Sequence, residues 1–202
     1  MAFALAGARI FDGESFLDDH AVVIDGARIA DVVQRPRVAS TVGVRDLGGG
    51  LLAPGFIDVQ VNGGGGALLN DDPTVETVRR IALSHRIFGT VGLLPTVITD
   101  APSVQAKAIA AVRDARAQAV PGVLGIHIEG PFLDIERKGA HAARFIREMT
   151  EDDAVQVAGC DCGSVMLTLA PNKVKPALVR VLAERGVLVS LGHAEASFAE
   201  AQ

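Results

Sequence analysis

The sequence has 202 residues, of which 49% are hydrophobic and 21% charged, and its formal net charge is −5. A chain of this length and apolar content can bury a substantial core, which excludes a disordered protein. The acidic balance, with no cluster of Lys or Arg, excludes nucleic acid as an expected partner. The absence of a long apolar run and of a basic leader segment predicts no membrane association and a cytoplasmic location.

The first predicted region, residues 1–50, consists of short β-strands and is expected to form part of a small β-sandwich. Strand-like segments at residues 21–24 and 27–33 flank Asp25-Gly26, a dipeptide suited to the positive φ values of a tight hairpin turn. Three glycines at positions 48–50 predict a linker, after which the pattern changes.

Residues 51–202 alternate between apolar strand-like runs and helical patterns. The runs lie at residues 55–61, 90–97, 123–128, 165–169 and 187–191, with helices expected at 72–88, 100–119 and 174–185. Such alternation predicts an α/β fold with a parallel sheet, either open and doubly wound or closed as a (β/α)₈ TIM barrel. Polar residues at the carboxyl ends of the strands favour the barrel, of which about the first five βα units are present. Residues 195–202 predict the start of a helix that is cut off at the end of the sequence.

Two of these strand-end residues are candidate metal ligands. Glu129 follows a buried strand, where a carboxylate without a cation or hydrogen-bond donors would be costly. A metal ion would satisfy it, and so would an ion pair with Arg137 or Lys138. His193 follows a later strand, so a barrel would bring it toward the same mouth; a hydrogen-bonded core histidine is the alternative. Hydrolytic zinc sites commonly combine two histidines with one glutamate and a water.

A family resemblance emerges from several separated motifs. LAPGFIDVQVNGGGG, residues 52–66, resembles the first barrel strand of amidohydrolases, most of which carry His-x-His there. Gln60-Val61-Asn62 occupies that place here, as in the single-metal N-acetylglucosamine-6-phosphate deacetylases. HIEGPF, KGAH, TLAP and SLGHA follow in that family's order and spacing. From the first hairpin onward, the chain resembles the amino-terminal portion of such a deacetylase.

The resemblance implies one divalent metal ion, held by Glu129 and His193, with zinc as first choice and iron, manganese or cobalt as alternatives. It also implies a set of residues that contact the substrate or line its pocket: Ala140, His141, Gln60 and Asn62. The implied reaction is hydrolysis of the acetamide of N-acetylglucosamine 6-phosphate to glucosamine 6-phosphate and acetate. His127, two residues before Glu129 on the same side of a strand, is expected at most to support the metal site.

The same resemblance implies parts that this sequence lacks. The third ligand, a histidine, and the general-base aspartate are expected beyond Gln202, so the catalytic set within the chain is empty. The chain is therefore expected to be truncated, to bind metal weakly alone and to turn over little, whereas the full-length enzyme is expected to be a homodimer. A different amidohydrolase, dihydroorotase-like or acting on N-acyl amino acids, is an alternative, but such an enzyme would be expected to keep His-x-His where Gln60 and Asn62 stand. A further alternative is a non-catalytic fragment or a pseudoenzyme.

Three further features have simpler interpretations. Cys160 and Cys162, separated by one residue in an expected extended segment, are too close for an ordinary disulfide and are expected to be inert. Asn172 stands where the family usually has an acidic residue, so no role is assigned to it. The glycines at positions 63–66 predict a turn in preference to a phosphate cradle.

Overall fold

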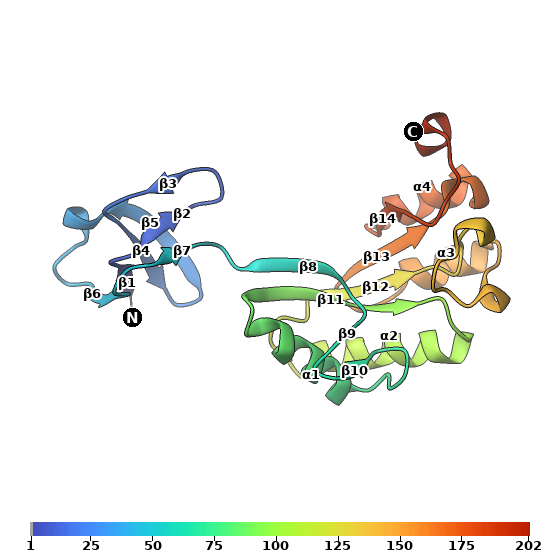
Figure 1. Cartoon of the computed structure of the whole chain (residues 1–202), viewed down its shortest axis with the longest axis horizontal. Coiled ribbons are helices and arrows are strands. Elements are labelled where there is room, and N and C mark those ends of the chain that lie inside the picture. The colour runs from blue at the N-terminus through green and yellow to red at the C-terminus, as the bar shows by residue number, and fades with distance from the viewer. Residues whose placement is uncertain (1) are drawn as a thin grey trace. The chain divides into compact units, whose positions relative to one another are not determined.

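The computed structural model describes residues 2–202 and divides the chain into two compact units (Figure 1). The first unit ends at Gly55, beyond the predicted boundary at residue 50, and the second runs from Phe56 to Gln202. Among the described residues, no helix has the length and apolar character needed to cross a membrane.

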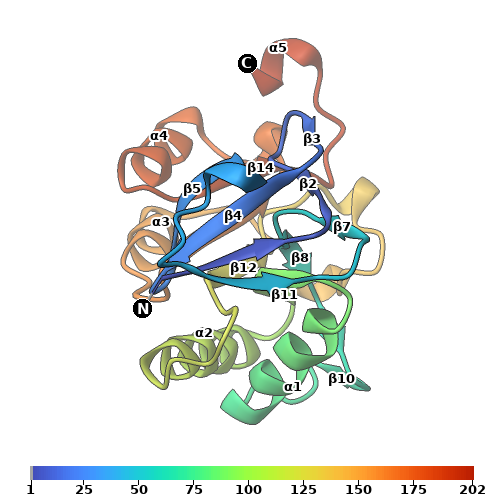
Figure 2. The same cartoon turned by 90° about the vertical axis from the view of Figure 1, so that its left-hand side faces the viewer.

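The amino-terminal unit consists of two small sheets, with strand orders β5-β4-β1-β6 and β3-β2-β7. Its strands are β1 (Phe3–Ala6), β2 (Arg9–Phe11), β3 (Phe16–Leu17), β4 (His20–Asp25), β5 (Arg28–Gln34), β6 (Gly43–Asp46) and β7 (Leu51–Leu52), with a 3-10 turn at Arg35–Arg37. The predicted hairpin is present: β4 pairs with β5, and Gly26 has a φ of 59° in the connecting turn. Strands β5, β4 and β1 lie side by side in Figure 2.

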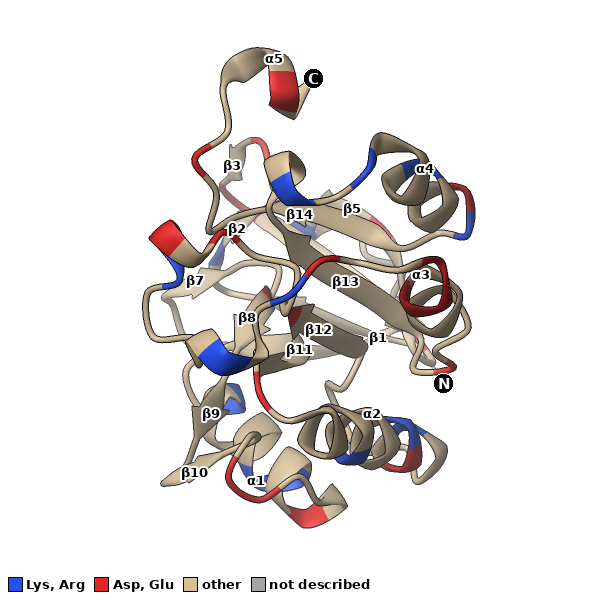
Figure 3. Ribbon diagram, turned by 90° about the vertical axis from the view of Figure 1, so that its right-hand side faces the viewer, with Lys and Arg blue, Asp and Glu red and all other residues tan. Residues whose placement is uncertain are grey.

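The second unit is built on a five-stranded parallel sheet, ordered β14-β13-β12-β11-β8. Its strands are β8 (Phe56–Val61), β11 (Thr90–Ile98), β12 (Gly125–Glu129), β13 (Ser164–Leu169) and β14 (Leu188–Leu191). The helices are α1 (Val75–Arg86), α2 (Pro102–Ala117), α3 (Glu151–Ala158), α4 (Pro176–Glu184) and α5 (Phe198–Ala201). Helices α1 to α4 follow one another around the same side of the sheet (Figure 3). Strands that neighbour one another in chain order, with helices outside, form half of a barrel.

Local sequence explains where the helices begin. Thr74 caps α1 by accepting a hydrogen bond from a backbone N–H, and prolines occupy the first turn of α2 and α4, where no amide donor is needed. Helix α3 is absent from the sequence prediction, although its signal is there. Thr150 and Asp153 form a reciprocal capping box at its start.

The core lies between the sheet and the helices. On β12, Ile126 and Ile128 face this core, while the alternate residues His127 and Glu129 belong to the opposite side. Each fully buried Leu or Ile contributes roughly 1.5–3 kcal/mol. Figure 3 shows how few charged residues the sheet carries; its five strands hold only Asp58 and Glu129. A buried carboxylate at the end of β12 therefore stands out.

Both edges of the sheet present apolar side chains to solvent. Phe56 on β8 is 69% exposed and Leu188 on β14 is 55% exposed. These are the unpaired edges expected of a half-barrel. The predicted glycine turn is confirmed, because β9 (Gly63–Gly64) and β10 (Ala67–Leu68) pair as a short hairpin. Short 3-10 turns at Ile135–Arg137, Ala143–Phe145 and Pro171–Lys173 complete the loops at the carboxyl ends of the strands.

Candidate metal centre

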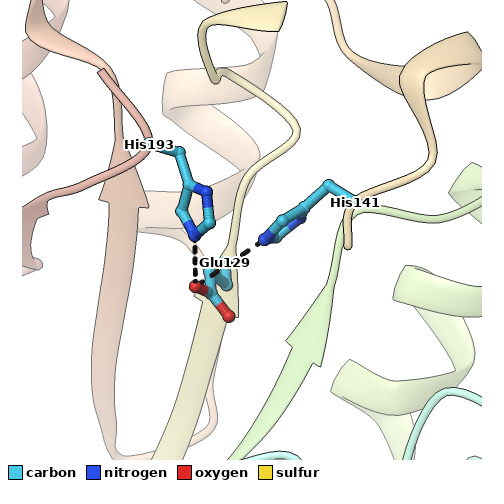
Figure 4. A group of neighbouring side chains, drawn as sticks. All are labelled: Glu129, His141 and His193. Carbon is cyan, nitrogen blue, oxygen red and sulfur yellow. Dashed lines mark hydrogen bonds and ion pairs between the residues drawn. The ribbon is translucent and has the colours of Figure 1, made fainter. Parts of the chain in front are cut away.

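Three side chains converge at the carboxyl ends of the parallel strands (Figure 4). Glu129 is the last residue of β12, His141 lies in the loop between β12 and α3, and His193 follows β14. One potential ligand atom from each lies within 4.8 Å of the others. The structure thus brings together Glu129 and His193, 64 residues apart in the sequence, as the barrel prediction requires.

Glu129 is 6% exposed and both of its carboxylate oxygens are engaged. Oε1 lies 3.0 Å from Nε2 of His193 and 3.7 Å from Nε2 of His141. Oε2 accepts a hydrogen bond of 3.1 Å from the side-chain amide of Gln60. His141 and then His193 lower the pKa of Glu129 to about 2, against the effect of burial, which raises it. The carboxylate is therefore negatively charged near neutral pH.

The proton of His193 can be placed from its backbone partner. Nδ1 lies 2.9 Å from the carbonyl oxygen of Arg137, and a carbonyl can only accept, so Nδ1 carries a proton. In the neutral ring, Nε2 then presents a lone pair to the Glu129 carboxylate. Two electron-rich atoms 3.0 Å apart require a cation between them, either a proton or a metal ion. The backbone of His193 has a φ of 51°, a left-handed conformation that is costly outside glycine and typical of functional sites.

His141 has the opposite arrangement. Its Nδ1 accepts a hydrogen bond of 3.2 Å from the backbone N–H of Thr99 and lies 2.8 Å from the Thr99 hydroxyl. A backbone amide can only donate, so Nδ1 carries no proton and Nε2 does. The Nε2–H of His141 thus points into the cluster as a donor. This atom suits a carbonyl or carboxylate oxygen and does not suit a metal ion.

The donor set therefore fits one divalent cation at Glu129 and His193, with a hydrogen-bond donor beside it. Carboxylate oxygen and imidazole nitrogen are ligands that zinc, iron, manganese and cobalt all accept. The alternative ion pair of Glu129 with Arg137 or Lys138 is not what the structure shows. Arg137 pairs with Glu195 at 2.7 Å, and the ammonium of Lys138 donates to a backbone carbonyl.

The remaining candidates lie around this cluster with varied contacts. Gln60 reaches Glu129 directly. Ala140 is exposed next to His141 in the chain, and Asn62 is half-buried, its backbone carbonyl accepting from Leu69. His127 is buried and lies within hydrogen-bonding distance of the hydroxyls of Thr96 and Thr168, at 3.4 and 2.8 Å, and burial lowers its pKa. These contacts hold the His127 ring on the same face of β12 as the Glu129 side chain.

Asn172 has a contact that sequence reasoning missed. Its side-chain amide donates to Asp134 at 2.8 Å, and the ammonium of Lys173 lies 3.7 Å from the same carboxylate. Asp134 also contacts the chain at His193, because its backbone N–H donates to the carbonyl oxygen of His193. Asn172 thus belongs to the support of the loop that holds His193.

Known proteins match the chain along its whole length. A family model described as "NagA composite domain" matches residues 2–52. The N-acetylglucosamine-6-phosphate deacetylase of Haemophilus influenzae is 34% identical over 98% of the chain and 52% of its own length. The crystal structure of the N-acetylglucosamine-6-phosphate deacetylase from Pasteurella multocida covers 100% of the chain with a TM-score of 0.92 and 32% identity. Over nearly its whole length, the chain is similar to N-acetylglucosamine-6-phosphate deacetylases.

The matched deacetylases are longer than this chain, and they are named for two different sugars. The chain spans about half the length of the curated relatives it matches, and 53% of the Pasteurella chain. A deacetylase named for the epimeric sugar is also similar: the N-acetylgalactosamine-6-phosphate deacetylase of Shewanella sp. (strain ANA-3) is 45% identical over 73% of this chain and 37% of its own.

Proposed function

We propose that this chain carries the metal-holding and substrate-positioning part of an enzyme that deacetylates N-acetylglucosamine 6-phosphate, with acetate and glucosamine 6-phosphate as products. One observation carries the proposal. A carboxylate oxygen of Glu129 and a lone pair of His193 meet at one point, and an imidazole N–H of His141 is directed at the same point. The family relationship supports the choice of substrate.

Each residue has a task that follows from its geometry. A divalent cation bound by Glu129 and His193 would supply Lewis acidity toward an amide carbonyl and lower the pKa of water. His141, held by Thr99 with its proton on Nε2, can donate to the acetamide carbonyl oxygen and orient it. Gln60 holds the second oxygen of Glu129 and so fixes the plane of that carboxylate. Burial of Glu129 and His141, 6% and 4% exposed, excludes water from the polar contacts between them.

A second candidate substrate is N-acetylgalactosamine 6-phosphate, favoured by the 45% identity to a deacetylase named for that sugar. The two sugars differ only in the configuration of one ring hydroxyl, so the acetamide chemistry is the same for both. Ala140 and Asn62 are proposed to contact the sugar. Zinc as the metal, a homodimeric full-length enzyme and a cytoplasmic location are proposed on the same family basis.

The experiment separates metal binding from sugar binding. Zinc affinity of the purified chain is measured by competition with a chromophoric chelator, for the wild type and for Glu129→Gln, His193→Ala and His141→Ala. We expect the first two variants to lose at least about tenfold in zinc affinity and His141→Ala to retain it. Calorimetry with each sugar phosphate then follows, with and without zinc. Binding is expected to need zinc and to weaken in His141→Ala.

A matched control is His20→Ala, which removes a histidine of the amino-terminal unit and should leave both affinities unchanged. Wild-type zinc affinity in Glu129→Gln would overturn the metal assignment. Equal sugar binding in the presence of EDTA would overturn the role of the metal in holding the substrate.

A further inference from the structure

The chain has only two cysteines, and the structure places their sulfur atoms in contact outside the metal centre. Sγ of Cys160 and Sγ of Cys162 lie 3.0 Å apart, just after the end of α3. The expectation that they lie in an extended segment is wrong, because the chain bends at Cys162 and Gly163 before β13 begins. In an extended segment alternate side chains still point the same way, but the bend brings these two thiols together.

The two thiols have different environments. Cys162 is completely buried, packs in the core between α2, α3 and the sheet, and its Sγ lies 3.4 Å from the backbone carbonyl of Ile109. Cys160 is only partly buried. The hydrogen bond with Cys162 and the guanidinium of Arg113 both lower the pKa of Cys160, whereas the same hydrogen bond and burial raise the pKa of Cys162. Cys160 is thus the accessible thiol that more readily becomes a thiolate.

We propose that Cys160 and Cys162 form a reversible oxidation site for small hydroperoxides, independent of the metal centre. The thiolate of Cys160 attacks the peroxide O–O bond and becomes a sulfenic acid, releasing hydroxide when the oxidant is hydrogen peroxide. The sulfur of Cys162 then attacks the Cys160 sulfur, an S–S bond forms, the S–O bond breaks, and water leaves with the proton of Cys162. The two thiols lose two electrons, and the peroxide gains them. A small dithiol reductant restores both thiols by exchange.

Geometry favours an internal bond over one between two chains. Cys162 has no exposed surface, so the thiol of another molecule cannot reach it in the folded state. Cys160 is already its neighbour. The ring closed by such a bond contains one intervening residue, so it removes little entropy from the unfolded chain and adds little stability. A disulfide of this kind suits a reversible modification better than it suits stabilisation of the fold.

The experiment uses the whole 202-residue chain and hydrogen peroxide as the probe. After brief exposure, remaining thiols are blocked with iodoacetamide and the protein is digested with trypsin. Residues 148–173 contain no internal Lys or Arg, so both cysteines stay in one peptide. We expect this peptide to lose two hydrogen atoms, to take up no iodoacetamide, and to recover both thiols after treatment with dithiothreitol.

Single variants test the order of events. In Cys162→Ala, the sulfenic acid of Cys160 has no partner and should be trapped by dimedone. In Cys160→Ser, the buried thiol of Cys162 should react much more slowly than the wild-type pair. The variant lacking both cysteines reports oxidation of the three methionines alone. Circular dichroism verifies that each variant is folded, and the Cys160→Ser result does not depend on changing the buried residue.

Three results would overturn the proposal. The wild-type peptide could gain oxygen atoms without losing hydrogens, the chains could become linked to one another, or both thiols could stay alkylable at peroxide levels that oxidise the methionines. None of these results bears on zinc binding at Glu129, so failure here and failure of the proposed function are distinguishable.

Discussion

Replacing Glu129 by Gln removes one negative charge and keeps the shape of the side chain. In the folded chain the pKa of Glu129 is lowered from 4.5 to about 2, by His141 first and then His193. A shift of this size in a buried carboxyl corresponds to about 3 kcal/mol of preference for the ionised form in the folded state. Without metal, we expect Glu129→Gln to lower the free energy of unfolding by about 2–3 kcal/mol at pH 7.

The pH dependence gives this prediction its sign. The folded-state pKa lies below the unfolded value, so the stabilisation is fully present above pH 4.5 and is lost as the pH falls toward 2. Glutamine does not titrate in this range. The difference between the wild type and Glu129→Gln should therefore shrink steadily with acidification and vanish near pH 2.

The assay is urea denaturation in EDTA, followed by circular dichroism at several pH values. Glu184→Gln, which removes an exposed carboxylate at the end of α4, is the matched control and should change stability by less than about 0.5 kcal/mol. Equal stability of Glu129→Gln and the wild type at pH 7 would refute the electrostatic reasoning. So would a difference that stays constant from pH 7 to pH 2.

Three more predictions concern the scaffold. Asp153→Ala removes the ion pair with Arg147 and the α3 capping box, which lower the pKa of Asp153 to about 2. We expect the free energy of unfolding, measured by urea denaturation, to fall by about 1–2 kcal/mol at pH 7, and this loss to disappear as the pH falls from 3.8 toward 2. Gly130→Ala places a Cβ against the Thr99 hydroxyl at a φ of 82° and should cost about 1–3 kcal/mol and weaken zinc binding in the chelator assay. Leu188→Lys charges the exposed edge strand β14 and should reduce self-association in sedimentation velocity without loss of stability.

Most of the secondary structure of residues 51–202 could be predicted from the sequence. The five strands lie within a few residues of their predicted places because continuous apolar runs bounded by glycine and helical patterns are local signals. The sequence prediction lacks the short helix α3 because its apolar pattern is brief, although the Thr150–Asp153 capping box indicates a helix start. The predicted helix at the end of the chain is present as α5 (Phe198–Ala201).

The candidate site was predicted unevenly. The sequence proposed Glu129 and His193 together from the rule that chemistry in barrels gathers at the carboxyl ends of strands, and the structure brings them to 3.0 Å. His141 was expected only as a substrate contact. Its place beside Glu129 depends on the path of a loop with no regular pattern, and so does the contact of Asn172 with Asp134. The contact between Gln60 on β8 and Glu129 on β12 depends on how the strands are ordered in the sheet.

The sequence alone therefore determined the alternation of strands and helices, the family resemblance, and the two residues proposed as metal ligands, because these follow from periodicity and motif order. Only the tertiary structure decided the protonation of the two imidazoles, since each ring nitrogen is assigned by a backbone partner, Thr99 or Arg137, distant in the chain. The contact between the Cys160 and Cys162 sulfur atoms likewise depends on the chain bend at Cys162 and Gly163 and on the contact of Cys162 with Ile109 of α2. Hydrogen-bond direction and side-chain contact depend on positions in space, which residue order does not specify.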